Sequence, residues 1–196
     1  MSITTKTGDG GHTDLIGGIR VSKDHPVMEC LGALDELNAF LGAAKAALRE
    51  KDPRDEKVRP GADAKTGGPA ADTGALIESI QKELFVISGL LAGSGAKAPP
   101  EGRLSAIIEE LESAQQPFAG FAVPGANPVS AHLHIARTIC RRAERRLAAL
   151  GCARENSGGA SPKLPPGILP YFNRLSDLLF LLAQREAGHG LPQNKI

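Results

Sequence analysis

The residues with the clearest chemical potential are five arginines crowded on one predicted helix at residues 127–150. They are Arg137, Arg141, Arg142, Arg145 and Arg146. Three of them stand at i, i+4 and i+8, where like charges repel, and Glu144 alone cannot neutralise the group. A solvated basic face explains the pattern as well as a bound polyanion does. Guanidinium groups grip phosphate oxygens bidentately, so on the second interpretation the ligand is a nucleoside triphosphate.

Start and stop signals bound this helix. Asn127 can cap the free amide groups, Pro128 fits the first position, and Gly151 predicts the end. Apolar residues between them recur at spacings of three and four, which predicts one stripe facing a core. This stripe contains Leu133, Ala136, Cys140, Ala143, Leu147 and Leu150. At about 100° per residue, Arg137 and Glu144 project together at its border.

A second candidate is the Gly-rich segment TKTGDGGHT at residues 5–13. Glycines let backbone N–H groups approach an anion, hydroxyl groups donate hydrogen bonds, and Lys6 adds charge, which together could form a phosphate cradle. The P-loop spacing is absent, however, and no strand precedes the segment. On this motif alone a flexible terminus is the favoured explanation. Arg20 and Lys23 either extend the cradle or are merely exposed.

Composition narrows the possible functions. A net charge of +1 and the lack of Trp argue against a nucleic-acid partner. Cys30, Cys140 and Cys152 have no metal or redox spacing, so we interpret them as small reduced residues. His132 and His134 point to different sides of a helix and cannot share a metal ion. Because no apolar run could span a bilayer and the N-terminus has no signal core, we expect a cytoplasmic protein without membrane partners.

Further helices must position these residues. They are predicted at residues 26–50, 75–92, 103–115 and 165–187. Residues 51–74 lack periodicity and predict a loop or flexible insertion. No convincing strand is present. The predicted fold is therefore an all-α, five-helix antiparallel bundle in one domain over residues 1–196.

Several side chains on or beside these helices have two explanations each. Asp35 and Asn38 border the apolar stripe of the first helix, where a carboxylate either points to water or needs a cationic partner. Asn173 and Asp177 are i, i+4 neighbours on the largely apolar last helix, so they join an internal network or face a ligand. Phe121, in the connection before the arginine helix, either fills the core or lines a flat apolar pocket.

Four stretches, taken in order, resemble the propanediol-utilisation type of ATP:cob(I)alamin adenosyltransferase. They are TKTGDGGHTDLIGGIRVSKD near the start, GALDELNAFLG on the first helix, ARTICRRAERR on the arginine helix and FNRLSDLLFLLA on the last. The resemblance covers residues 3–45 and 117–187. It implies a ferritin-like five-helix bundle that assembles as a homotrimer with active sites between neighbouring subunits. The implied reaction transfers the 5′-deoxyadenosyl group of ATP to the cobalt of cob(I)alamin and releases triphosphate.

The same resemblance implies roles for individual residues. The N-terminal loop, residues 1–25, would surround the triphosphate, and the arginine and last helices would contact the nucleotide. The residues implied for ATP are Thr5, Lys6, Thr7, Gly8, Thr13, Asp14, Lys23, Arg141, Arg142, Glu144, Arg145 and Asn173. Arg137 would pair with Asp35 across the subunit boundary, and Phe121 would lie against the lower face of the corrin. Mg²⁺ is implied with ATP, without assigned protein ligands.

Two positions depart from the family pattern. Gly125-Ala126 stands where Gly-Gly is expected, and Asp14 stands where a small hydroxyl residue is common. A carboxylate beside a triphosphate needs a metal bridge or must turn away.

The reaction implied here needs no nucleophilic side chain, because Co(I) itself attacks C5′. The protein would position the substrates and stabilise the departing polyanion. By excluding the lower axial ligand, Phe121 would make Co(II) four-coordinate and easier to reduce. The competing hypothesis is a non-catalytic ATP-binding helical regulator or a corrinoid carrier, which would not require Asp35, Arg137 or Phe121. An adenosylcobalamin-dependent enzyme that receives the product is a further conceivable partner.

Overall fold

The computed structural model describes residues 4–51, 72–100, 102–114, 123–156 and 164–188. Within these ranges the chain forms five helices, as predicted. They are α1 (Pro26–Lys51), α2 (Thr73–Leu91), α3 (Gly102–Ala114), α4 (Pro128–Asn156) and α5 (Ile168–Ala187).

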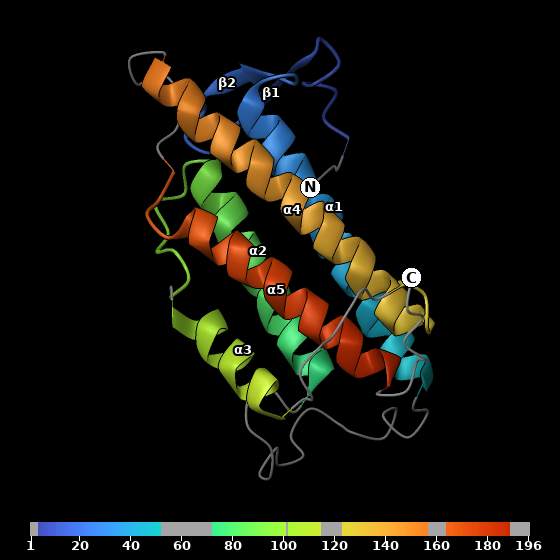
Figure 1. The fold of residues 1–196 in the computed structure, drawn as a ribbon. Helices are drawn as coiled ribbons and strands as arrows, with labels where there is room; N and C mark the ends of the chain where they lie inside the picture. The colour runs from blue at the N-terminus through green and yellow to red at the C-terminus, as the bar shows by residue number, and fades with distance from the viewer. Residues whose placement is uncertain (1–3, 52–71, 101, 115–122, 157–163, 189–196) are drawn as a thin grey trace.

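The long helices pack as an elongated bundle (Figure 1). Helix α4 contacts both α1 and α5, α2 packs on α1, and α3 lies along α5. The pairs α1/α4, α4/α5 and α1/α2 run antiparallel, whereas α3 runs in the same direction as α5 (Figure 1). Helix α4 therefore has one face against α1 and another against α5, and these two faces carry different arginines.

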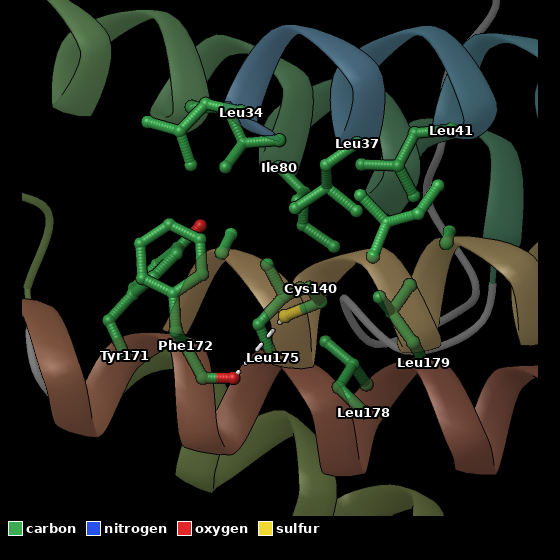
Figure 2. Close-up of a cluster of buried hydrophobic side chains, with 14 of the residues drawn as sticks. Leu34, Leu37, Leu41, Ile80, Cys140, Tyr171, Phe172, Leu175, Leu178 and Leu179 are labelled. Atoms are coloured by element: carbon green, nitrogen blue, oxygen red, sulfur yellow. Dashed lines mark hydrogen bonds between the residues drawn. The ribbon is translucent and has the colours of Figure 1, made fainter. Parts of the chain in front are cut away.

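The core lies where the apolar stripes of the helices meet. Leu37 of α1, Ile80 of α2 and Leu175 of α5 are fully buried and converge with Cys140 of α4 (Figure 2). The Cys140 thiol donates a hydrogen bond to the carbonyl of Phe172 at 3.4 Å. Each fully buried leucine or isoleucine contributes about 1.5–3 kcal/mol relative to an exposed one. The period of the sequence pattern thus identifies the side chains that hold the bundle together.

The expectation of no strand was wrong. Strands β1 (His12–Asp14) and β2 (Arg20–Ser22) pair antiparallel, with Thr13 opposite Val21 and Asp14 opposite Arg20. The turn between them contains Gly17 and Gly18 at φ of 84° and 77°, a conformation that favours glycine. Three-residue strands are too short to show a readable alternation in the sequence. The hairpin is docked on the end of α2, because the Ile16 N–H donates to the Ala92 carbonyl at 3.0 Å.

Two helix ends also differ from the prediction. Helix α4 passes through Gly151 and continues to Asn156. A Cβ atom at Gly151 would lie 3.3 Å from Cδ1 of Leu164, so packing against that side chain accounts for this glycine. Helix α5 begins at Ile168 rather than at residue 165, because Gly167, at φ 84°, forms its left-handed N-terminal boundary. The start of α4 was predicted correctly, since Asn127 Oδ1 accepts from the Ser130 N–H at 2.9 Å.

Candidate active site

The negative charge of Asp14 is paired with Arg20 within the N-terminal hairpin. Nη1 of Arg20 donates to both carboxylate oxygens of Asp14, at 3.1 and 3.2 Å. Nη2 of the same guanidinium donates to the Thr7 carbonyl at 2.9 Å. Asp14 has therefore turned to a cation of its own hairpin, which resolves the conflict that a carboxylate near a triphosphate would create. Arg20, whose role the sequence left open, fixes the loop to the strands.

The loop before β1 gathers the remaining N-terminal residues predicted for ATP. The hydroxyl groups of Thr5 and Thr7 lie 2.9 Å apart, and Lys6 has φ of 60°. A Cβ atom at Gly8 would lie 3.2 Å from Nζ of Lys23, so the ammonium group of Lys23, which follows β2, packs over Gly8. Thr5, Lys6 and Thr7 of this largely exposed loop therefore lie near a second lysine, and hydroxyl and ammonium groups are suited to phosphate oxygens. Thr13 lies beside this loop in β1 and is half-buried.

The arginines of α4 divide between its two faces. Arg142 pairs with Glu36 of α1. Arg146 also reaches α1, where its guanidinium lies 2.9 Å from the Glu29 carboxylate and donates to the Glu29 carbonyl at 3.1 Å. These two charges are neutralised within the chain, so the α1 face of the helix needs no external anion. Arg142, predicted to bind ATP, is thereby separated from the other arginines predicted to do so.

The opposite face of α4 lies against α5 and holds a groove of about 540 Å³. Asn173 Nδ2 donates to Glu144 Oε1 at 3.4 Å, so these two predicted residues are brought together. Ser105, Leu169, Pro170 and Arg174 complete the lining with Glu144 and Asn173. This volume falls within the range of small-molecule sites. No sequence pattern pointed to Ser105, because its position depends on how α3 packs beside α5.

Two exposed arginines of α4, Arg141 and Arg145, lack acidic partners among the described residues. Nη1 of Arg145 donates to the Arg141 carbonyl at 3.0 Å, and in the described part of the chain neither residue forms an ion pair. Nearer the start of the helix, Nε of Arg137 is buried without a hydrogen-bond partner. Nε of Arg142 is buried without a hydrogen-bond partner as well, although the guanidinium of Arg142 pairs with Glu36. Such orphaned donors are rare in folded proteins, and Arg137, unlike Arg142, has no ion pair among the described residues.

His134 lies close to Arg137 and is nearly fully buried. Its ring stands edge-on to Phe180 of α5, with centroids 6.1 Å apart. Burial, and then the nearby Arg137 charge, lower the pKa of His134 below its usual value of 6.5. A neutral imidazole is therefore the form that fits beside Arg137.

Asp35 lies elsewhere in the chain. It is exposed on α1 and lines a second groove, of about 560 Å³, together with Asn38 and residues of α2. Gln81 of α2 donates to the Asn38 carbonyl at 3.1 Å, whereas Asn38 Oδ1 is buried without a partner. No ion pair joins Asp35 to Arg137 among the described residues. Phe121, the third residue predicted to act in catalysis, lies outside the described residues.

Two of the three cysteines, Cys30 and Cys140, are buried, whereas Cys152 is exposed. Burial raises the pKa of Cys30 to about 11 and that of Cys140 further still, so both thiols stay protonated. The described residues contain no group of three His, Cys, Asp or Glu side chains that could hold a metal ion.

Asp177 pairs with Arg174 at 3.4 Å rather than with Asn173. None of the described helices is both long and apolar enough to cross a membrane.

Fold and site together define a helical bundle in which one helix presents two exposed arginines without ion pairs among the described residues and contributes Glu144 to a groove of ligand size. The family model for cobalamin adenosyltransferase matches residues 3–186, and the chain belongs to this family.

Named relatives agree with this assignment. The corrinoid adenosyltransferase PduO of Citrobacter freundii is 36% identical over 205 residues, which cover 100% of this chain and 52% of the relative. The match to PduO of Salmonella typhimurium covers 53% of that relative. The chain therefore spans about half the length of these two curated relatives. The cobalamin adenosyltransferase of Cupriavidus metallidurans is 37% identical, over 96% of this chain and 90% of the relative.

Solved structures show the same fold. A variant of the PduO-type ATP:co(I)rrinoid adenosyltransferase from Lactobacillus reuteri, complexed with ATP, superposes with a TM-score of 0.73 at 28% identity, covering 94% of each chain. Another variant of that enzyme, complexed with cobalamin and ATP, gives a TM-score of 0.71 at 26% identity over 95% of this chain and 93% of the other.

Proposed function

We propose that this chain transfers the 5′-deoxyadenosyl group of ATP to the cobalt of cob(I)alamin. The observation that carries the proposal is the division of charge on α4. Arg142 and Arg146 are neutralised by α1, while Arg141 and Arg145 are exposed and form no ion pair among the described residues, on the helix that contributes Glu144 to the groove. Unpaired guanidinium groups on a helix that lines a groove are suited to bind a nucleoside triphosphate.

In the reaction, the electron pair of Co(I) forms the cobalt–carbon bond to C5′, and the C5′–oxygen bond breaks. The electrons of that bond leave with the triphosphate, so the barrier depends on stabilising a departing polyanion. Lys6 and Lys23 of the N-terminal loop and Arg141 of α4 are the cations we assign to it. Loss of one such contact costs on the order of 10²–10³ in rate, by analogy with oxyanion donors.

Mg²⁺ fits this scheme as a companion of the nucleotide. Mg²⁺ at nucleotide sites is usually held by substrate phosphates and water with few carboxylates. The described residues hold no three-ligand cluster, and Asp14 is occupied by Arg20. When bound, the ion would screen the charge of the triphosphate as it leaves. The protein would then bind the ion through the phosphates rather than through a dedicated cage.

We further propose that the active site is shared between subunits of a homotrimer. Among the described residues Asp35 forms no ion pair with Arg137, and the buried Nε of Arg137 has no hydrogen-bond partner. A neighbouring chain that brings its Asp35 to this Arg137 would satisfy both groups. Phe121, as the family resemblance implies, would face the lower side of the corrin and exclude the axial ligand.

The test is direct. Pre-reduced cob(I)alamin and Mg-ATP are mixed with the protein under anaerobic conditions, and the loss of the Co(I) absorbance is followed with time. We expect turnover with release of one triphosphate per corrinoid adenosylated. The Arg141→Ala variant should be slowed by about 10²-fold or more. Tight ATP binding without any turnover would instead identify a regulator or a corrinoid carrier.

A further inference from the structure

A half-buried hydrogen-bond network joins three helices through one carboxylate, that of Glu83 on α2. Arg103 of α3 donates from Nη1 to Glu83 Oε1 at 2.7 Å. The hydroxyl group of Tyr171 on α5 donates to the other carboxylate oxygen at 2.8 Å. Arg103 also donates from Nη2 to the Ser79 hydroxyl at 2.6 Å, and that hydroxyl donates to the Leu76 carbonyl at 2.8 Å. Both oxygens of Glu83 are thus used, one by each neighbouring helix.

This network is more buried than an ordinary surface ion pair. The side chains of Glu83 and Arg103 are 18% and 31% exposed, and Tyr171 is 4% exposed. Charge-assisted hydrogen bonds in such surroundings are strong, and removing one partner leaves a poorly solvated charge behind. Burial, with the Glu83 charge as the next cause, raises the pKa of Tyr171 well above its usual value. Its hydroxyl therefore remains a donor across the whole working range of pH.

The network lies directly behind the groove that holds Glu144 and Asn173. Arg103 stands two residues before Ser105 on α3, and Tyr171 stands two residues before Asn173 on α5. Residues two apart on a helix point to nearly opposite sides and differ by only about 3 Å along the axis. Arg103 and Tyr171 point back to α2, while Ser105 and Asn173 line the groove at the same level.

We infer that Glu83 is a positioning residue that sets the distance between Ser105 and Asn173, and thereby the affinity for the nucleoside end of ATP. This inference rests on the proposed function. It assigns α3 to the substrate site, and it gives Ser105 a role as the third wall of the groove.

The lining of the groove selects the nucleoside rather than the phosphates. Glu144 contributes a carboxylate, which repels phosphate but accepts hydrogen bonds from ribose hydroxyl or adenine amino groups. Leu169 and Pro170 provide apolar surface for a flat base, and Ser105 and Asn173 add hydrogen-bonding groups. Arg174 also lines the groove, but its charge is paired with Asp177 at 3.4 Å. The triphosphate is left to Arg141, Arg145 and the N-terminal lysines. A change in the width of the groove should therefore affect the two ends of ATP differently.

The experiment measures calorimetric dissociation constants for ATP and for inorganic triphosphate, using Glu83→Gln, Tyr171→Phe and a control. Tyr171→Phe keeps the ring packed and removes only the bond from α5 to Glu83. The matched control is Glu110→Gln, the same substitution at an exposed carboxylate of α3. We expect the dissociation constant for ATP to rise about tenfold in both network variants, which is the effect of losing one hydrogen bond. Their affinity for triphosphate, and both affinities of the control, should stay within about twofold of the wild type.

Three outcomes would overturn the inference. In the first, the variants lose affinity for ATP and for triphosphate to the same extent. In the second, neither affinity changes while the melting temperature falls. Both outcomes indicate a purely structural network. If Glu83→Gln loses its helical circular dichroism, Tyr171→Phe decides alone by the same criteria. In the third, wild-type protein binds triphosphate but not ATP, or binds neither. That result refutes the proposed function itself and is distinguishable, because it appears before any variant is made.

Discussion

Single residues in the N-terminal loop show how local pairing decides which charges remain for a ligand. Asp14 was the least expected residue for an ATP loop, and its carboxylate is held by Arg20. The same guanidinium holds the Thr7 carbonyl, so Arg20 couples the strand pair to the loop. Lys6 and Lys23 remain as the cations of this loop for an incoming phosphate.

Substitution of the two partners should therefore have unequal effects. Arg20→Ala releases both the Thr7 carbonyl and the Asp14 charge, and we expect the KM for ATP to rise about tenfold or more. Asp14→Asn removes the negative charge but leaves the bond to Thr7, so the KM for ATP should change less than about threefold. Steady-state kinetics at saturating corrinoid make the comparison. A larger defect in Asp14→Asn than in Arg20→Ala would show that Asp14 itself acts on the nucleotide.

His134 gives a residue-scale prediction of pH dependence. Its pKa is lowered in the folded protein, so the unfolded chain binds the proton more readily than the folded one. Stability should then fall as the pH drops through and below the usual value of 6.5. The His134→Gln variant should lose this part of the slope. Urea unfolding of both proteins between pH 7.5 and 5.5 tests it, and parallel curves would contradict the assignment.

At the scale of elements, the sequence predicted most of what local periodicity controls. The apolar stripes located all five helices, including α4, which carries the arginines. That these arginines bind a nucleotide stays a prediction. What the sequence could not reveal depends on contacts between distant segments. Gly151 predicted a helix end because glycine commonly follows the last residue of a helix. Its contact with Leu164, which accounts for the glycine, joins two residues that are distant in sequence. The Glu83 network joins residues 20 and 88 positions apart, which no window of sequence can connect.

The division of α4 into two faces leads to an element-scale prediction about neighbouring arginines. Arg142 faces α1 and pairs with Glu36, and both side chains are about two-fifths exposed. Arg142→Ala should lower stability by at most about 1 kcal/mol and change the KM for ATP little. Arg141→Ala should do the reverse, with near-native stability and a large loss of kcat/KM. Thermal unfolding and kinetics on the two variants separate the faces, and a larger kinetic defect in Arg142→Ala would place the nucleotide on the α1 side.

At the scale of the whole molecule, the proposed homotrimer depends on two residues, Asp35 and Arg137, that do not meet within the described part of one chain. Asp35 lies in a groove between α1 and α2, whereas Arg137 borders the α5 side of α4. Among the described residues, Nε of Arg137 is buried without an acceptor, and Asp35 is an exposed carboxylate that is accessible to a neighbouring chain. Closed rings of identical subunits satisfy such complementary pairs by placing one chain's first surface against the next chain's second surface.

A mixing experiment tests this arrangement without a structure of the assembly. Asp35→Ala and Arg137→Ala should each be nearly inactive alone, because every interface then lacks one partner. When the two variants are unfolded together and refolded at equal concentrations, an interface is intact only if its Arg137 comes from the first variant and its Asp35 from the second. Random assembly gives this combination at roughly a quarter of interfaces, so about a quarter of the wild-type activity should return. The control mixes each variant with itself. No recovery in mixed oligomers whose exchange is verified by mass spectrometry would show that Asp35 and Arg137 do not meet between chains.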